Sequence, residues 1–176
     1  IKGKVKNGND FIDSSRKNGS SIIISSEKKG HDVISINNSY IKEVYSLLCS
    51  SFYENKPSNI VGVTGTNGKT SVVEFCRQIW ELTGWKSASI GTLGTIVSGA
   101  KKITSDVENL TTLDASSLNY ELNELSKKNI THLALEASSH GLVQKRLDGI
   151  NFCGAIFTNL SHDHLDFHNT FENYFL

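Results

Sequence analysis

The sequence is poor in several features that mark specialised classes of protein. It has no methionine and a single proline among 176 residues, and its 18 basic residues balance 18 acidic ones. A balanced charge gives no sign of a nucleic-acid or anionic membrane partner. No apolar run approaches the roughly 20 residues that cross a bilayer, and the first residues do not form a signal peptide. These absences leave an ordinary globular protein.

Cysteine is also scarce. Cys49, Cys76 and Cys153 are odd in number, widely spaced and set among apolar neighbours. This pattern argues against a disulfide framework or a zinc knuckle and favours buried, reduced thiols. We therefore expect a cytoplasmic protein.

The most informative segment is residues 59–70, where an apolar strand runs into a glycine-rich turn ending in Lys69-Thr70. We expect the glycines at 62, 65 and 68 to turn with positive φ and bring N–H groups close to an anion. The helix that follows adds the positive end of its dipole. Lys69 can then reach the β and γ phosphates of a nucleotide, and the Thr70 hydroxyl can hold Mg²⁺.

The spacing of this segment departs from the usual phosphate-loop pattern. G-x-x-x-x-G-K-[ST] requires glycine at position 63, where this sequence has Val63. A glycine-rich turn with a solvated lysine is the alternative. The apolar spacing after Thr70 predicts a helix that ends at Gly84, which is the context a phosphate loop needs.

The pattern along the chain predicts two domains. Residues 1–57 hold a short α/β unit with strands at 21–25 and 32–36 and a helix over 40–53, whose apolar face is Ile41, Val44, Leu48 and Phe52. The only proline, in Lys56-Pro57-Ser58, marks the boundary. Residues 58–176 alternate strand and helix, which is typical of a parallel sheet covered by helices.

Further elements follow in this second domain. We expect a strand over 87–91, a helix with Leu118, Leu122 and Leu125 on one face, and strands at 131–136 and 153–158. The last two are nearly all apolar and are therefore expected to be central in the sheet.

Glu136 ends one of these strands, and in open α/β sheets ligands bind at the carboxyl ends of the strands. If its strand neighbours that of the phosphate loop, Glu136 can hold Mg²⁺ beside the triphosphate. A strand-end cap or an ion-pair partner is the plainer interpretation.

A cluster of histidines and aspartates follows the last strand. His162, His164, Asp166 and His168 alternate with other residues, similar to the H-x-H-x-D-H signature of two-metal hydrolases but with one residue too many before the last histidine. In that interpretation the cluster holds zinc and activates a water. A polar loop that caps the strand and the next helix is the alternative.

Segments 65–70, 136–146 and 157–168 occur in the order and spacing seen in Mur ligases. Among these enzymes the combination is most similar to the type that adds the third residue of the peptidoglycan stem peptide. The first 57 residues resemble the latter part of the family's UDP-binding domain and the rest most of its ATP-binding domain. The resemblance implies an α/β fold, with a P-loop-type, mostly parallel sheet and helices on both faces, preceded by a partial small α/β domain.

The resemblance also implies roles for single residues. The catalytic residues are Lys69, Glu136 and His164. The ligands of Mg²⁺ are Thr70, Glu136 and His164. The residues that bind ATP are Gly65, Thr66, Asn67, Gly68, Lys69, Thr70 and Asn159. The residues that contact the UDP-MurNAc-dipeptide are Thr111, Thr112, Ser138, Gln144 and Arg146.

The implied reaction is an ATP-dependent ligation that adds a diamino acid to UDP-MurNAc-L-Ala-D-Glu through an acyl phosphate. The sequence does not decide between meso-diaminopimelate and L-lysine, and we expect meso-diaminopimelate because it is frequent in Gram-negative bacteria. The partners are then small molecules, and the bacterial protein is expected to be a cytoplasmic monomer. His162 stands where the family usually has arginine, and Leu113 where it often has proline. A lysine and a C-terminal domain known in the family lie beyond Leu176, so the 176-residue chain alone is expected to be inactive.

Two other functions remain open at this stage. A zinc hydrolase would bind metal tightly and need no ATP. A regulatory nucleotide-binding module would bind nucleotide without depending on an acceptor.

Overall fold

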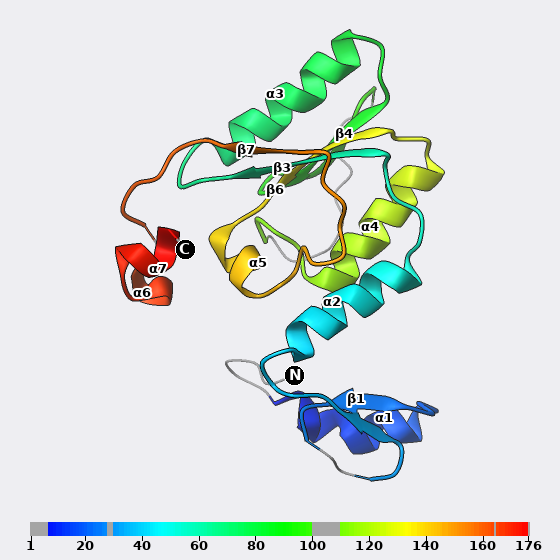
Figure 1. Ribbon diagram of the computed structural model, residues 1–176. Coiled ribbons are helices and arrows are strands. Elements are labelled where there is room, and N and C mark those ends of the chain that lie inside the picture. The colour runs from blue at the N-terminus through cyan, green and yellow to red at the C-terminus, as the bar shows by residue number, and fades with distance from the viewer. Residues whose placement is uncertain (1–6, 28–29, 100–109, 164, 176) are drawn as a thin grey trace. The chain divides into compact units, whose positions relative to one another are not determined.

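A computed structural model describes residues 7–27, 30–99, 110–163 and 165–175 (Figure 1). The chain divides into two compact units, Ile1–Tyr45 and Ser46–Leu176. The division falls within helix α2 (Ile41–Phe52), ahead of the predicted boundary near Pro57. A domain boundary at residue 57 therefore stays a prediction.

The first unit is built around a two-stranded sheet. Strands β1 (Ile23–Ser25) and β2 (Val33–Ser35) pair in parallel, as short versions of the two predicted strands. They follow a 3-10 helix η1 (Gly8–Phe11) and helix α1 (Ile12–Lys17). The buried Ser25 hydroxyl donates to the Asn9 side chain over 2.5 Å, so a hydrogen bond holds part of this small interior.

Helix α2 forms where the sequence predicts it, but two of the four residues predicted for its apolar face are exposed. Ile41 is buried, whereas Leu48 and Phe52 are 47% and 78% exposed. Small polar residues take the inner positions instead. Ser46 is buried, and the Ser50 hydroxyl donates to the Gly149 carbonyl over 2.7 Å.

In the described residues of the second unit, five strands form a sheet in the order β5-β4-β6-β3-β7. Its strands are β3 (Asn59–Thr64), β4 (Ser87–Gly91), β5 (Gly94–Val97), β6 (His132–Glu136) and β7 (Gly154–Phe157). All pair in parallel except β5, which is antiparallel to β4 and which the sequence did not predict. The predicted mostly parallel sheet is confirmed.

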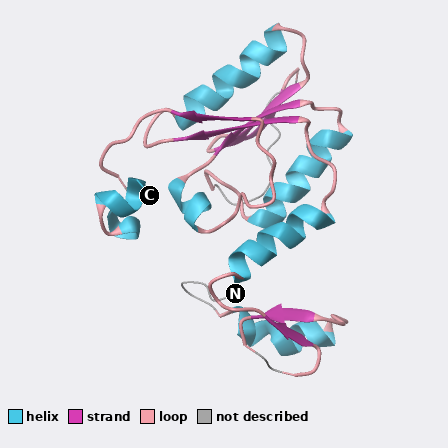
Figure 2. Cartoon of the chain, in the orientation of Figure 1, coloured by secondary structure: helices cyan, strands magenta, loops and turns pink. Residues whose placement is uncertain are grey.

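Helices cover both faces of this sheet (Figures 1 and 2). Helix α3 (Lys69–Leu82) places Val73 against Val63 and Ala134 on one face. Helix α4 (Ala115–Lys127) places its predicted leucines in the core on the other face, which includes Ile60 and Leu133. Alternate residues of β3 and β6 thus point to opposite helix layers, as the two-residue period of a strand requires.

Strand β6 is central, as predicted, but β7 is not. β7 pairs with β3 on one side and ends the described sheet, and Phe157 is 59% exposed. Apolar composition alone did not distinguish a central strand from one whose second edge has no described partner. The neighbouring Cys153 is exposed, against the expectation of a buried thiol.

Three short helices complete the second unit: α5 (Ser139–Val143), α6 (Leu165–His168) and α7 (Phe171–Phe175). Among the helices of the described residues, none is both long and apolar enough to cross a membrane.

Candidate active site

Three of the predicted motifs meet at the carboxyl edge of the sheet. β3 lies between β6 and β7, with Val63 paired to Glu136 and Thr64 paired to Phe157. The Ala137 amide donates to the Val63 carbonyl over 2.8 Å and continues this pairing past the end of β6. Glu136, the loop after β3 and the segment after β7 therefore adjoin one another, as ligand-binding groups of α/β sheets commonly do.

Two glycines of the loop have the conformation that the sequence predicts. Gly65 has φ 129° and Gly68, which caps α3, has φ 85°. Gly62 does not turn, because it lies inside β3, where an added Cβ would come 3.1 Å from the Phe152 ring. Val63, where the usual pattern has glycine, is a fully buried core residue.

Lys69 lies across the loop. Its Nζ donates to the carbonyl of Gly65 over 2.7 Å and to that of Thr66 over 2.9 Å. The ammonium group is therefore held at the loop rather than extended into solvent, which argues against the solvated-lysine alternative. Thr70, half-buried, is in the first turn of α3.

Asn159, two residues beyond the end of β7, holds the loop in place. Its Oδ1 accepts from the Asn67 amide over 3.1 Å, and its Nδ2 donates to the Asn67 carbonyl over 2.9 Å. The Thr158 hydroxyl donates to the same carbonyl over 2.7 Å. Because both ends of its side-chain amide bind the loop backbone, Asn159 supports the loop, and direct contact with a nucleotide stays a prediction.

The side chain of Thr66 is buried by the segment after β7. Its Oγ1 accepts from the Ser161 amide over 2.9 Å and lies 2.8 Å from the Tyr174 hydroxyl of α7. Both contacts, like those of Asn67, fix the shape of the loop from outside. The Thr66 and Asn67 amides themselves donate to Asn159, over 2.9 and 3.1 Å, so these contacts fix the backbone that leads to Lys69.

Glu136 is a buried carboxylate, 1% exposed, and no described lysine or arginine forms an ion pair with it. Its Oε1 accepts from the Thr92 amide over 2.9 Å, and its Oε2 lies 3.3 Å from the Thr92 hydroxyl. An unpaired buried charge is costly unless a cation offsets it. The environment of Glu136 therefore suits a bound cation.

The predicted substrate residues form a connected network. The Thr112 hydroxyl donates to the Glu136 carbonyl and lies 2.9 Å from the Ser138 hydroxyl. Arg146 donates to the Thr112 carbonyl through Nη1 and to Gln144 Oε1 through Nε and Nη2. These bonds hold the guanidinium plane in one orientation, which a bidentate contact with an anion requires.

A cavity of about 260 Å³ brings the loop lysine and this network together. Its described lining residues are Lys69, Leu110, Thr111, Thr112, Ser138, His140 and Arg146. Lys69, Thr111, Thr112, Ser138 and Arg146 were predicted from the sequence as site residues. Two cationic groups and several hydroxyl groups thus face one space, which suits a substrate rich in anionic and hydroxyl groups.

The histidine cluster does not form a metal site among the described residues. His164 lies outside them, and no group of three or more histidine, cysteine, aspartate or glutamate side chains within them could hold a metal ion. His162 and Asp166 are exposed, whereas His168 is buried with its ring 5.1 Å from that of Tyr174. The structure therefore does not bring His162, Asp166 and His168 together, and the role of His164 stays a prediction.

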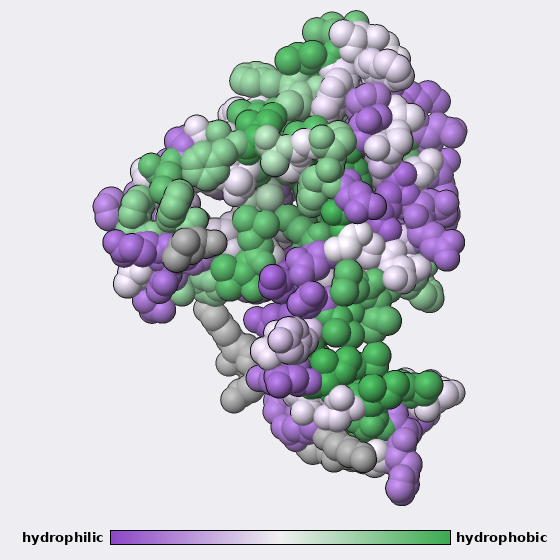
Figure 3. Space-filling view, viewed as in Figure 1, coloured by the Kyte–Doolittle hydropathy of each residue, from purple (hydrophilic) through white to green (hydrophobic). Residues whose placement is uncertain are grey.

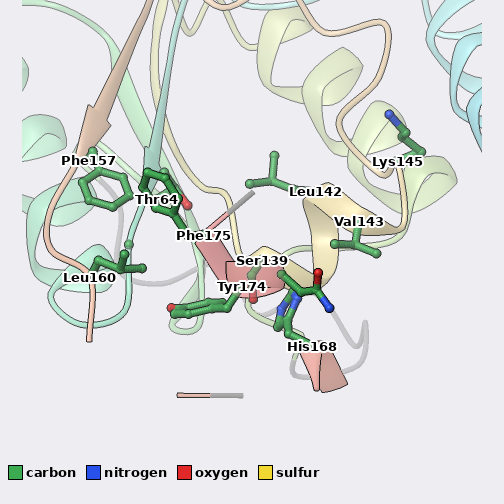
Figure 4. Close-up of a pocket in the computed structure, with 12 residues that line it drawn as sticks. Thr64, Ser139, Leu142, Val143, Lys145, Phe157, Leu160, His168, Tyr174 and Phe175 are labelled. Carbon is green, nitrogen blue, oxygen red and sulfur yellow. The ribbon is translucent and has the colours of Figure 1, made fainter. Parts of the chain in front are cut away.

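A second cavity, of about 340 Å³, is lined in part by Thr64 and Gly65. Figure 4 shows Leu142, Val143, Phe157 and Phe175 around it, so much of its lining is apolar. We assign the candidate site to the smaller cavity, because Lys69 and Arg146 line it. Their positive charges suit the phosphate and carboxylate groups of a substrate.

Sequence reasoning missed three residues of this region: Gly91, Thr92 and His140. Gly91 is the last residue of β4 and Thr92 follows it, and the strand-end rule that selected Glu136 would have found them had β4 been placed beside β6. Gly91 has no room for a side chain, since an added Cβ would overlap the Glu136 carboxylate. His140 lines the cavity, and its ring lies 4.0 Å from that of Phe167, a residue distant in sequence.

The fold and the site define a class of protein, the phosphate-loop α/β domains, in which a loop at the end of a parallel strand presents backbone amides and a lysine. Comparison with known proteins narrows this class. Residues 63–176 match the family described as the Mur ligase middle domain. This chain belongs to the Mur ligase family.

Individual relatives agree with this assignment. UDP-N-acetylmuramoyl-L-alanyl-D-glutamate--2,6-diaminopimelate ligase of Rickettsia felis is 44% identical over the whole chain, which covers 34% of that protein. The ligase of the same name from Rhizobium meliloti is 51% identical over 71% of this chain and 25% of its own length. A solved structure of a ligase so named superposes with a TM-score of 0.77 at 32% identity, over 94% of this chain and 33% of that one. The chain thus spans about a third of the length of such relatives.

Proposed function

We propose that the protein is an ATP-dependent ligase that joins an amino acid to UDP-MurNAc-L-Ala-D-Glu in peptidoglycan synthesis. The observation that supports this most directly is the 260 Å³ cavity, in which Lys69 of the phosphate loop faces Thr111, Thr112, Ser138 and Arg146. A nucleotide at the loop and an acceptor carboxylate in the cavity would then be adjacent. Such adjacency is the main requirement for phosphoryl transfer, which depends on positioning and charge stabilisation.

In the proposed reaction a carboxylate oxygen of the D-glutamyl residue attacks the γ-phosphorus of ATP. The bond to the bridging oxygen breaks, and ADP leaves. The amine of the incoming amino acid then attacks the acyl carbon and displaces phosphate, with loss of a proton from the nitrogen. Lys69 would stabilise the charge on the transferred group, and Arg146 would orient the acceptor.

The residues present fit a bound Mg²⁺ ion. Glu136 offers a buried carboxylate without a described cationic partner, and Thr70, the second residue of α3, offers a hydroxyl. Oxygen ligands of this kind are those that Mg²⁺ prefers. When bound, the ion would neutralise the charge of the nucleotide phosphates, with His164 proposed as a further ligand.

We further propose meso-diaminopimelate as the added amino acid, since both relatives described above carry 2,6-diaminopimelate in their names. Lysine is the competing substrate. The proposed partners are therefore small molecules, and a monomeric state stays a prediction.

The test is an assay of the natural full-length protein with ATP, UDP-MurNAc-L-Ala-D-Glu and each amino acid in turn. We expect ADP to be released only when UDP-MurNAc-L-Ala-D-Glu and an amino acid are both present. Diaminopimelate should be the preferred amino acid. Lys69→Ala should lower turnover at least about 100-fold, while Lys17→Ala, at an exposed position of α1, should not change it. Near-normal turnover by Lys69→Ala would overturn the role of this lysine.

The same assay separates the other two functions. A regulatory nucleotide-binding module would bind ATP with no dependence on either acceptor. A zinc hydrolase would carry tightly bound zinc, which metal analysis of the purified protein would detect. Either result would contradict the ligase proposal.

A further inference from the structure

Thr92 is the immediate neighbour of the Glu136 carboxylate. Both hydrogen bonds that the carboxylate accepts from described residues come from Thr92, one from the amide and one from the hydroxyl. A carboxylate has about four acceptor positions. Thr92 therefore occupies two of the acceptor positions of the Glu136 carboxylate, and the other positions are left for another ligand.

The position of Thr92 is set by close packing. An added Cβ at Gly91 would overlap the Glu136 side chain, so the backbone at the end of β4 lies directly against the acid. β4 and β6 pair in parallel with Ile90 opposite Leu135, which places Gly91 next to Glu136. The amide of Thr92 is consequently fixed by the sheet itself and does not depend on a flexible side chain.

The Thr92 hydroxyl also connects the acid with the cavity. It lies 3.3 Å from Glu136 Oε2 and 3.2 Å from the hydroxyl of Thr111, which lines the cavity with Lys69. A threonine hydroxyl has one proton to donate and two lone pairs to accept with. Its single proton can go to Glu136 Oε2 or to the Thr111 hydroxyl, so the acid and this cavity residue share one donor.

We infer that Thr92 is a positioning residue that orients the Glu136 carboxylate for a divalent cation and couples that orientation to the substrate side of the cavity through Thr111. This inference rests on the proposed function. Groups that hydrogen-bond a metal ligand typically change metal affinity about 10- to 100-fold when they are removed. The amide contact remains in any side-chain variant, so the lower end of this range applies.

The variant that isolates the hydroxyl is Thr92→Val, which keeps the shape and the amide. In the natural full-length protein we would titrate Mg²⁺, and separately Mn²⁺, against binding of a fluorescent ADP analogue. Thr92→Val should raise the metal concentration for half-saturation about tenfold, with little change in nucleotide binding at saturating metal. Thr92→Ser, which restores the hydroxyl, should return the value to within about twofold.

The chain offers a matched control in the same hairpin. Thr95 is 1% exposed, and its hydroxyl has no described partner. Thr95→Val makes the same chemical change three residues away and should leave the metal dependence unaltered. Thermal unfolding of the variants shows whether an effect on metal arises from lost stability.

The possible results separate the inference from the function on which it rests. Half-saturation of Thr92→Val within twofold of wild type, or an equal shift in Thr95→Val, would overturn the role of Thr92 while ligation by wild type continued. A shift in Thr92→Val that serine does not reverse would assign Thr92 a structural role and also overturn it. If wild type showed no metal-dependent nucleotide binding, both the role of Thr92 and the proposed function would be contradicted.

Discussion

The two units of the chain differ sharply in how much of their apolar surface they bury. In the first unit, Ile22 is 64% exposed and Ile34 51% exposed, and Figure 3 shows apolar side chains at the surface over β1 and β2. In the second unit, Leu133, Leu135 and Leu118 are fully buried. Where the structure describes the chain, the first unit has two strands of three residues, whereas the second has five strands between two helix layers.

This difference explains where the candidate site lies. Two short strands give little independent stability, because they cannot enclose a core. Functional groups must be held within fractions of an ångström by rigid elements. The buried strands β3 and β6 meet this requirement, and their ends carry the phosphate loop and Glu136.

The largest expected difference between the units concerns the core. Leu133→Ala should destabilise the second unit by about 2 to 5 kcal/mol, because it removes buried methyl groups and leaves a cavity. Ile34→Ala in the first unit should change stability by no more than about 0.5 kcal/mol, because the side chain is half exposed. Native-state hydrogen exchange at the amides of β6 and β2 measures each unit separately. Equal effects of the two substitutions would remove the contrast between the units.

A smaller effect is expected at the ion pairs of α3. Arg77, with its side chain 10% exposed, pairs with Glu74 and Glu81 over 2.5 Å each, and the Ser89 hydroxyl of β4 donates to Glu74 over 2.9 Å. Glu74→Gln should cost about 2 kcal/mol at pH 7, less than a fully buried pair because the site is partly solvated. Glu121→Gln, a change of the same kind on α4, is the control.

The effect of Glu74→Gln on stability should depend on pH, and the pKa of Glu74 determines in which direction. Burial alone would raise the pKa of Glu74, but hydrogen bonds from Arg77, Gln78 and Ser89 outweigh it and lower the pKa. A lowered folded-state pKa gives a contribution that is present above the unfolded value of about 4.3 and is lost as the pH falls through the folded value. The cost of Glu74→Gln should therefore shrink in acid, as urea unfolding at several pH values would measure. A cost independent of pH would contradict the assignment.

The smallest effect is expected at the ion pair of the first unit. Arg16 donates to both oxygens of Asp32, over 2.6 and 2.7 Å, and this hydrogen bonding lowers the pKa of Asp32. The side chains are 34% and 30% exposed, so solvent and salt screen the pair. Asp32→Asn should weaken exchange protection in the first unit slightly near pH 7 and not at all below the folded-state pKa of Asp32. Persistence of the effect in 1 M salt would show a contribution larger than a screened pair can give.

Much of the fold was predictable because its signals are local. The apolar spacing before Gly84 predicted α3, and Leu118, Leu122 and Leu125 predicted α4. The errors came from positions decided by distant neighbours. Composition did not reveal that β7 lies at the edge of the described sheet, and helical spacing did not reveal that Ser46 would be buried in place of Leu48.

The candidate site divides in the same way. The chemistry of Lys69, Thr70 and Glu136 could be inferred from residue types at the ends of strands. The hydrogen bonds of Thr92 to Glu136 join residues 44 apart in sequence, and those of Asn159 to Asn67 join residues 92 apart. No local pattern predicts such contacts, because they depend on the order of the strands.

The residues themselves were sufficient to indicate a phosphate-binding loop, since glycine readily adopts the positive φ of Gly65 and Gly68 and a cation such as Lys69 suits a polyphosphate. Folding decided which groups surround that loop. Strand order and register place β6 on one side of β3 and β7 on the other, and these arise from packing between segments that are far apart in the chain. That packing brings the buried Glu136, Thr92 and the side-chain amide of Asn159 to one edge of the sheet.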